Sequence, residues 1–516
     1  MKYRSTRGGV SGLTFTEAVL SGLADDGGLL LPEKIPNVPA TTVNKWRSLP
    51  YQELCYEVLR LYIQSSEIDD RDLRDIIQTS YRSFRHPEIA PTVKLGDYYL
   101  LELFHGPTYA FKDVALQLLG TLFDYILSKQ NRHTVILGAT SGDTGSAAIA
   151  GFRGRSNADC VILYPKGRTS EIQRLQMTTV PDDNVYCIEI DGNFDDCQNI
   201  VKTLFGSPLK QRLKLGAVNS INWARILAQM VYYWYSAFRV LDMTKSTKVD
   251  FCVPTGNFGN ILAGYYAKQM GAPIGNLIIA SNSNDILTRF HNSGSYSLTQ
   301  VQPTLSPSMD IQVSSNFERF LYDAFGKDAE AVKERFISLK RTGEFRVGEQ
   351  ELSKTRGAFH AYCANEEETQ AAMKATYKQH GVIVDPHTAV GIACADQFRT
   401  EHPQDGKRHP LVCLATAHFG KFPDGVSRAI NKLIVDASMP EELSKLKSLP
   451  QRSVPMPASS RRVARFLSAK FDKNRWLPLK IADRLGELIA DNCVTVSAVA
   501  AAALVAAVAL ALAKRK

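Results

Sequence analysis

The chain has few cysteines, and none stands in a pattern that binds metal or forms a redox pair. Its nine cysteines are spread over 516 residues, at positions 55, 160, 187, 197, 252, 363, 394, 413 and 493. No Cys-x-x-Cys motif and no cluster of cysteine with histidine occurs, which argues against a zinc or redox site. Several cysteines fall inside strand-like runs, as small buried residues do. The pattern predicts no metal site and fits a reducing compartment.

Long runs of one charge are also absent. The net charge of +9 is modest for this length. No Lys/Arg run is interleaved with aromatic residues, so nucleic acid is not an expected partner. A basic balance still favours an anionic, phosphorylated ligand. The N-terminus carries no secretory or transit pattern, and we therefore expect a cytoplasmic protein.

A lysine after a hydrophobic segment is the first candidate for chemistry. Lys112 ends the run Leu101-Glu-Leu-Phe-His-Gly-Pro-Thr-Tyr-Ala-Phe-Lys112, with aromatic Tyr109 and Phe111 close by. Apolar neighbours disfavour an ammonium, so the pKa of this amine should fall toward neutrality. A neutral amine attacks aldehydes, as the lysine of a pyridoxal 5′-phosphate (PLP) enzyme does. The alternative is a solvated surface lysine, the commoner case.

Three turns rich in glycine or threonine follow strand-like segments, which is an arrangement typical of anion sites when a helix comes next. They are residues 140–146 after the strand 133–139, residues 255–260 after 251–254, and residues 416–421 after 411–415. For the first, N-capping by Ser or Thr is an alternative. The second is neither a G-x-G-x-x-G nor a P-loop motif, and an ordinary tight turn is its alternative. Thr416 is expected at a strand's carboxyl end, where open α/β sheets bind ligands.

Further segments surround these in a fixed order along residues 1 to about 467. They are Tyr3-Arg-Ser-Thr-Arg-Gly8, Asp26-Gly-Gly-Leu-Leu-Leu-Pro32, Val161-Ile-Leu-Tyr-Pro-Lys-Gly167, Ile190-Asp-Gly-Asn-Phe-Asp195, Asn219-Ser-Ile-Asn-Trp-Ala-Arg225, Asn282-Ser-Asn-Asp285, Ser308-Met-Asp-Ile311 and Asp385-Pro-His387. Together with the Lys112 segment and the three turns, they resemble threonine synthase, a family of fold-type II PLP enzymes.

The resemblance implies an α/β fold of the tryptophan synthase β-like type, with parallel-sheet large and small domains and a helix-rich N-terminal lobe. The lobe would cover 1–95, with helices over 42–64 and 71–84. The catalytic region would cover 96–450, with a small domain inserted at about 125–215, and a basic extension would follow over 451–492. The residues agree, because strand-like runs at 133–139, 160–164, 184–190, 249–254, 277–281 and 411–415 alternate with helical stretches such as 222–239 and 261–270.

The resemblance also implies roles. Lys112 would carry PLP covalently and then act as acid and base, Asp143 would lie beside the cofactor's 3′-oxygen, and Thr416 would bond its pyridine nitrogen. The cofactor phosphate would be held by Gly256, Asn257, Phe258, Gly259 and Asn260. The substrate carboxylate would be received by Thr140, Ser141, Gly142, Thr144 and Gly145.

Asn219 and Arg225 match the family's pair for the substrate phosphate, with Lys166 adding charge. An arginine fork suits phosphate, although a helix-surface ion pair is the alternative for Arg225. His105, His387 and His418 are expected to make structural hydrogen bonds.

The implied reaction converts O-phospho-L-homoserine and water to L-threonine and phosphate. One alternative is a phospho-lyase of the same fold that releases 2-oxobutyrate, ammonia and phosphate. A more distant one is a non-catalytic, tethered or secreted descendant of the fold. The sequence does not determine the oligomeric state.

The C-terminus lies outside the resemblance. Residues 493–513 contain no charged side chain and precede Lys514-Arg515-Lys516. A helix needs about 20 residues to span a bilayer, but alanine contributes little to insertion. A tail anchor in an intracellular membrane, a packed or peripheral helix, and a disordered tail all remain open.

Overall fold

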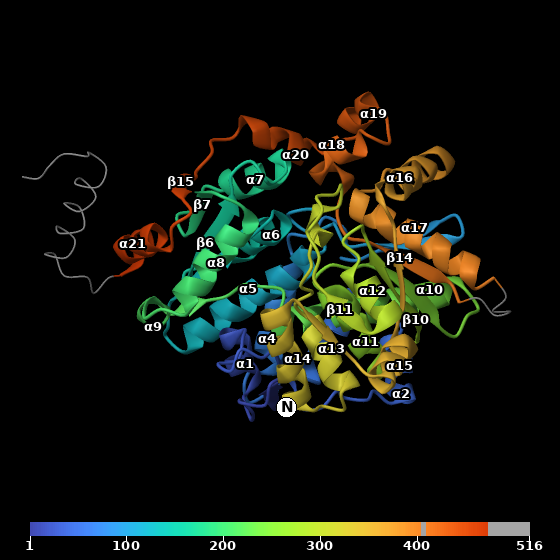
Figure 1. Ribbon diagram of the computed structural model, residues 1–516, viewed down its shortest axis with the longest axis horizontal. Coiled ribbons are helices and arrows are strands. Elements are labelled where there is room, and N and C mark those ends of the chain that lie inside the picture. The colour runs from blue at the N-terminus through green and yellow to red at the C-terminus, as the bar shows by residue number, and fades with distance from the viewer. Residues whose placement is uncertain (404–408, 473–516) are drawn as a thin grey trace, which may run out of the picture.

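Two mainly parallel β-sheets form the body of the protein, as the computed structural model shows (Figure 1). The structure describes residues 1–403 and 409–472. The larger sheet has the order β13-β10-β9-β14-β4-β3, and of its neighbouring pairs β3–β4 is antiparallel. Its strands are β3 (Thr92–Leu95), β4 (Tyr98–Glu102), β9 (Val249–Pro254), β10 (Ile274–Ser281), β13 (His360–Cys363) and β14 (Leu411–Ala415).

The second sheet is parallel throughout, with the order β15-β7-β6-β5-β8. Its strands are β5 (Thr134–Ala139), β6 (Ala158–Pro165), β7 (Val185–Asp191), β8 (Leu215–Gly216) and β15 (Val454–Pro457). The helices that accompany it are α6 (Asp143–Phe152), α7 (Glu171–Thr178), α8 (Phe194–Phe205), α9 (Leu209–Arg212) and α21 (Ser460–Phe471). Strand β15 and helix α21 come from far along the chain and complete this sheet beside β7 and α8 (Figure 1).

The sequence placed residues 454–471 in a basic extension, and the structure instead packs them on the second sheet. Helix α21 is amphipathic, and its Val463 and Leu467 are fully buried among side chains of this sheet. Of the basic residues in this helix, Arg461, Arg462 and Lys470 are exposed, so charge alone was a poor guide to the boundary.

The N-terminal region is rich in helices, but the last residues of the expected lobe 1–95 form β3, which is the edge strand of the larger sheet. The expected helix 42–64 is two helices. These are α2 (Ala40–Trp46) and α3 (Tyr51–Arg60). Pro50 lies between them, and a proline lacks the N–H for the helical bond and disfavours the helical conformation of the residue before it. The lobe also contains β1 (Tyr3–Ser5), α1 (Phe15–Ser21), β2 (Leu30–Pro32) and α4 (Asp70–Tyr81).

Two central helices carry much of the core. Helix α5 (Lys112–Lys129) and helix α10 (Trp223–Met243) pack on each other and are apolar on nearly every side. A helix with this pattern must be enclosed by other elements. The remaining helices of the larger-sheet region are α11 (Gly259–Gln269), α12 (Ile286–Ser293), α13 (Phe317–Ala324), α14 (Ala329–Thr342), α15 (Glu349–Ala358), α16 (Glu366–His380) and α17 (Pro386–Glu401).

Short elements complete the described chain. They are β11 (Ser295–Ser297), β12 (Glu344–Arg346), the short helices α18 (Pro423–Val426), α19 (Lys432–Ala437) and α20 (Glu441–Lys445), and the 3-10 turns η1 (Pro307–Met309), η2 (Phe419–Lys421) and η3 (Leu446–Ser448). The α/β fold class, with parallel sheets and a helical N-terminal lobe, is confirmed. None of the described helices is long and apolar enough to cross a membrane. The tail segment 493–513 lies outside the described residues.

The N-terminal lobe is tied to helix α13 by buried polar contacts. Arg7, in the first family-like segment, forms a forked pair with Glu318, with Nε–Oε1 at 3.1 Å and Nη2–Oε2 at 2.8 Å. Arg319 is fully buried and donates to the carbonyl oxygens of Leu30 and Ile221, both at 2.6 Å from Nη2. The second carbonyl lies between Asn219 and Arg225, so Arg319 links the lobe to the expected substrate segment.

Replacing Arg319 by Met should lower the free energy of unfolding by about 3 kcal/mol, because a buried carbonyl that loses its donor costs about 1–3 kcal/mol. Urea denaturation followed by tryptophan fluorescence measures this. Arg341→Met, at an exposed position of α14, is the control and should change little. Equal midpoints for the two variants would show that the Arg319 bonds do not hold the lobe.

Candidate cofactor and substrate site

Lys112 is the first residue of α5, and the loop before it is fastened to the segment after β14. The Phe111 N–H donates to the Thr416 carbonyl at 2.7 Å, and the His418 N–H donates to the Tyr109 carbonyl at 3.0 Å. These bonds bring the third predicted turn against the Lys112 loop. The buried Asp113 carboxylate closes the loop by accepting from the N–H and the hydroxyl of Thr108, and burial raises the pKa of Asp113 to about 6.

The Lys112 amine has the lowered pKa that the sequence suggested. Burial is the largest cause, because water no longer solvates the ammonium. Asp143 opposes the shift, whereas the charges of Arg225 and Lys421 add to it. The expected direction is therefore confirmed. Arg225 and Lys421, which are remote from Lys112 in the sequence, also contribute to the lowered pKa, and the flanking aromatic residues gave no sign of them.

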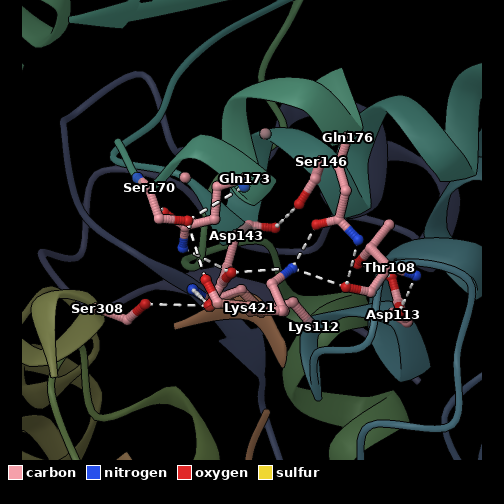
Figure 2. Close-up of polar contacts among 12 residues, drawn as sticks. Thr108, Lys112, Asp113, Asp143, Ser146, Ser170, Gln173, Gln176, Ser308 and Lys421 are labelled. Carbon is pink, nitrogen blue, oxygen red and sulfur yellow. Dashed lines mark hydrogen bonds and ion pairs between the residues drawn. The ribbon is translucent and has the colours of Figure 1, made fainter. Parts of the chain in front are cut away.

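Asp143 is the carboxylate beside that amine (Figure 2). Its Oδ2 lies 3.6 Å from Lys112 Nζ, and its Oδ1 lies 3.1 Å from Lys421 Nζ. Gln173 donates to Oδ1 at 2.9 Å and Ser308 donates to Oδ2 at 3.1 Å. Burial opposes ionisation of Asp143, but the charges of the two lysines outweigh it and hold the pKa of its carboxyl well below the usual range.

Lys421, Gln173 and Ser308 were not predicted as site residues. Lys421 ends the third turn and Ser308 begins a family-like segment. The sequence therefore placed both residues in relevant segments but assigned neither of them a role. Gln173 is the N3 residue of α7 and reads as a capping-box partner of Ser170, which it also is. Only the tertiary structure shows that all three side chains meet at Asp143.

The turn 255–260 has the form of an anion cradle. In the described part of the chain, the backbone N–H groups of Gly256, Asn257 and Phe258 donate to no other group. Phe258 has a left-handed φ of 61°, and its ring is held among Phe317 and Phe359. A Cβ at Gly256 would lie 3.1 Å from Met309 Cα and from the Ser308 carbonyl. Tight packing around the turn therefore maintains the left-handed conformation of Phe258, which costs about 1–3 kcal/mol for a residue other than glycine.

Asn260 is oriented by two tyrosines of α10. Tyr232 and Tyr233 donate from their hydroxyls to its Oδ1, at 2.6 and 2.9 Å. Its Nδ2 is buried and has no partner. A buried donor without an acceptor is costly, so this nitrogen is set up to bond an anion in the cradle.

The hydroxyl of Thr140 closes the turn 140–146, although the N-cap position of α6 itself is Gly142. The Thr140 hydroxyl accepts from the N–H groups of Gly142 and Gly145, at 2.9 and 2.8 Å. Thr140 thus closes the turn at the start of α6, and these two amides already have partners. Ser141 and Thr144 remain partly exposed at the same helix start. The carboxylate roles given to Thr140, Ser141, Gly142, Thr144 and Gly145 stay predictions.

Arg225 is buried in α10 and makes no ion pair among the described residues. Its Nε and Nη1, and Oδ1 of Asn219, are buried atoms without hydrogen-bond partners. Burial lowers the pKa of Arg225 to about 10. The surface ion pair that was the alternative for Arg225 is therefore excluded. A buried, unpaired guanidinium is a fitting receptor for a phosphate dianion.

The other predicted residues fall in different places. Thr416 is buried, with its carbonyl bonded to the Lys112 loop. Lys166 is exposed after β6, and no contact joins it to Arg225. The histidines have structural partners: His105 bonds Glu102, His387 bonds Asp385 and the Ser308 N–H, and His418 accepts from the Gly420 N–H.

Comparisons with known proteins agree with this geometry. Family models match for the threonine synthase N terminus over residues 2–81, for a pyridoxal-phosphate dependent enzyme over 78–338, and for the threonine synthase C-terminal region over 388–467. The threonine synthase of Saccharomyces cerevisiae is 46% identical, with 87% of this chain and 94% of the relative covered. That of Pseudomonas aeruginosa is 44% identical, with 93% and 100% covered. The crystal structure of PLP-bound threonine synthase from Brucella melitensis superposes with a TM-score of 0.86 at 44% identity, with 91% of this chain and 99% of that chain covered.

Arg225 gives a test of the site that needs no turnover. Arg225→Met should raise the free energy of unfolding of the ligand-free protein by about 1–3 kcal/mol, because it removes buried donors that have no partner. Inorganic phosphate should stabilise the parent protein more than the variant. Arg319→Met is the matched control, since it changes an equally buried arginine whose donors are used. If both substitutions destabilise alike, Arg225 serves the fold and not a ligand.

Proposed function

The chain belongs to the threonine synthase family, and we propose that it uses PLP to convert O-phospho-L-homoserine and water to L-threonine and phosphate. The observation that carries this proposal is a buried lysine amine with two separate anion receptors in the same region, the turn 256–260 and Arg225. The reaction requires two receptors, because the cofactor and the substrate each bring a phosphate.

The residues present fit the cofactor. Lys112 provides the amine, and the free N–H groups of 256–258 with Asn260 Nδ2 provide donors for its phosphate. Asp143 and Thr416 are the groups proposed for the 3′-oxygen and the ring nitrogen. When bound, PLP supplies an electron-withdrawing ring that makes the Cα proton of an attached amino acid acidic.

Lys112 is the proposed proton carrier. Burial lowers its pKa and so favours the neutral amine, whose Nζ can take the proton from Cα and return a proton afterward. Overall the Cγ–O bond breaks with its electron pair leaving on phosphate. A hydroxyl from water then bonds to Cβ, and protons are returned to carbon.

Arg225 and Asn219 are the proposed receptors of the substrate phosphate. A guanidinium held in a buried site is not screened by water, so it stabilises the charge that develops on a departing phosphate more strongly than a surface arginine would. It also holds the chain so that Cα faces the amine. Placement of this kind accounts for much of the rate gain in enzymes.

Exclusion of water is the remaining requirement, since early protonation on carbon would divert the reaction. The side chains of Lys112, Asp143 and Lys421 are 13%, 4% and 0% exposed. The acid–base centre is therefore nearly closed. The phospho-lyase alternative would share the cofactor site and differ in release of 2-oxobutyrate and ammonia.

Lys112→Ala should abolish both the visible absorbance of bound cofactor and turnover, because no other amine occupies this position. Absorbance titration with PLP and a phosphate-release assay measure the two effects. Lys94→Ala, at an exposed lysine of β3, is the control. Full activity of Lys112→Ala without added amine would disprove the assignment.

The tail 493–513 is proposed, from sequence alone, to tether a cytoplasmic enzyme to a membrane. Truncation after Asp491 should leave kcat/KM unchanged, because none of the proposed site residues lies beyond Lys421. It should move the protein from the membrane fraction to the soluble fraction. Full-length protein that is recovered soluble, or is stripped from membranes by carbonate, would eliminate the tether and leave the enzyme proposal intact.

A further inference from the structure

Lys421 is a fully buried cation with every donor paired. Its side chain is 0% exposed, and Nζ lies 2.7 Å from the Thr108 carbonyl, 2.8 Å from Gln176 Oε1 and 3.1 Å from Asp143 Oδ1 (Figure 2). An ammonium has three protons to donate, and burying one is costly unless each finds an acceptor. The fold therefore encloses this charge with a complete set of partners.

The partners of Lys421 come from separate parts of the fold. Thr108 is in the loop before Lys112, whereas Asp143 and Gln176 are on α6 and α7, the helices of the second sheet. The backbone carbonyl of Lys421 also accepts from the Ser170 hydroxyl at 3.0 Å. Lys421 thus connects the cofactor-lysine loop to the second sheet at the acid–base centre.

The two carboxylate oxygens of Asp143 have different partners. Oδ1 is occupied by Lys421 and Gln173. Oδ2 accepts from Ser308 and is the oxygen nearest the Lys112 amine. Rotation of the carboxylate would break the contacts of both oxygens, so Lys421 and Gln173 keep Oδ2 turned toward the amine.

The charge on Lys112 changes during the proposed reaction, and the charge on Lys421 need not. When the Lys112 amine is neutral, Asp143 would be a buried carboxylate without a counter-ion if Lys112 were its only partner. Such a state is strongly unfavourable, because a buried charge without a partner has lost its hydration. Lys421 also lowers the pKa of the buried Asp113 carboxyl, but its ion pair is with Asp143, with Nζ and Oδ1 3.1 Å apart, and it remains available there as the cation.

We propose that Lys421 is a positioning residue of this site, the permanent counter-ion that keeps Asp143 ionised and its Oδ2 directed at Lys112 in each protonation state of that amine. The link to turnover depends on the proposed function. The arrangement itself does not.

The sign of the electrostatic effect follows from charge counting. With Lys421 present, loss of the Lys112 proton takes the three groups from a net +1 to neutral. Without Lys421, the same loss takes a neutral pair to a buried net −1, which is less favourable. The other charged or titratable groups around this cluster are Arg225 from α10, Asp113 from α5 and His387 from α17. None of them is substituted in the comparison, but loss of Lys421 also removes a cation that lowers the pKa of Asp113.

The test is the pH dependence of the reaction of the PLP-free, full-length protein with pyridoxal, followed by absorbance. Pyridoxal lacks a phosphate and so does not rely on the cradle. Lys112→Ala provides the blank for other lysines. The midpoint is the pH at which half of the maximal reaction with pyridoxal is seen. Lys421→Met should move this midpoint upward by about one pH unit, as expected for loss of a nearby charge. Lys421→Arg, which keeps the charge, should stay near the parent midpoint.

A purely structural role predicts that Lys421→Met unfolds at lower temperature but keeps the parent midpoint, and this result would overturn the proposal. If Lys421→Met does not fold, Asp143→Asn provides the second test. It leaves two cations together and should move the midpoint downward, and an unmoved midpoint would again overturn the proposal. Midpoints that shift as expected in a protein that forms no threonine would refute the proposed function and leave the role of Lys421 standing.

Discussion

The buried carboxylate of Asp143 is the constraint on which the candidate site depends. It begins a helix of the second sheet, yet its partners Lys112, Lys421 and Ser308 belong to the region of the larger sheet. A buried carboxylate must have cations beside it, so the two sheets are held in one relative position at this point. The amine that the chemistry needs is thereby kept in a closed site, where burial, Arg225 and Lys421 lower its pKa and Asp143 opposes them.

Among the described residues, the two buried arginines Arg225 and Arg319 show how the same side chain serves the fold in one place and is available to a ligand in another. Arg319 has its donors occupied by carbonyl oxygens and an amide oxygen. Arg225, in contrast, has buried nitrogens without acceptors. A protein that tolerates this cost gains a receptor for an anion. The same reasoning marks Asn260, whose oxygen is held by two tyrosines and whose nitrogen is left free.

Much of the fold could be predicted from sequence, because buried parallel strands are continuous apolar runs and the turns after them are rich in glycine and threonine. The resemblance supplied Lys112, Asp143 and Arg225. The break at Pro50 was a local signal that was overlooked, and β15 was missed because basic residues around it suggested exposure. Lys421 could not be assigned, since its partners Thr108 and Gln176 are remote in sequence and a lysine is usually a surface residue.

At this site, phosphate is proposed to leave from Cγ of the substrate and water to add at Cβ. The most direct measurement supplies the purified PLP-loaded protein with O-phospho-L-homoserine in water enriched in heavy oxygen, followed by mass spectrometry of the products. The account predicts threonine with the heavy oxygen in its hydroxyl and phosphate without it. Formation of 2-oxobutyrate and ammonia in place of threonine, or of homoserine with labelled phosphate, would contradict it.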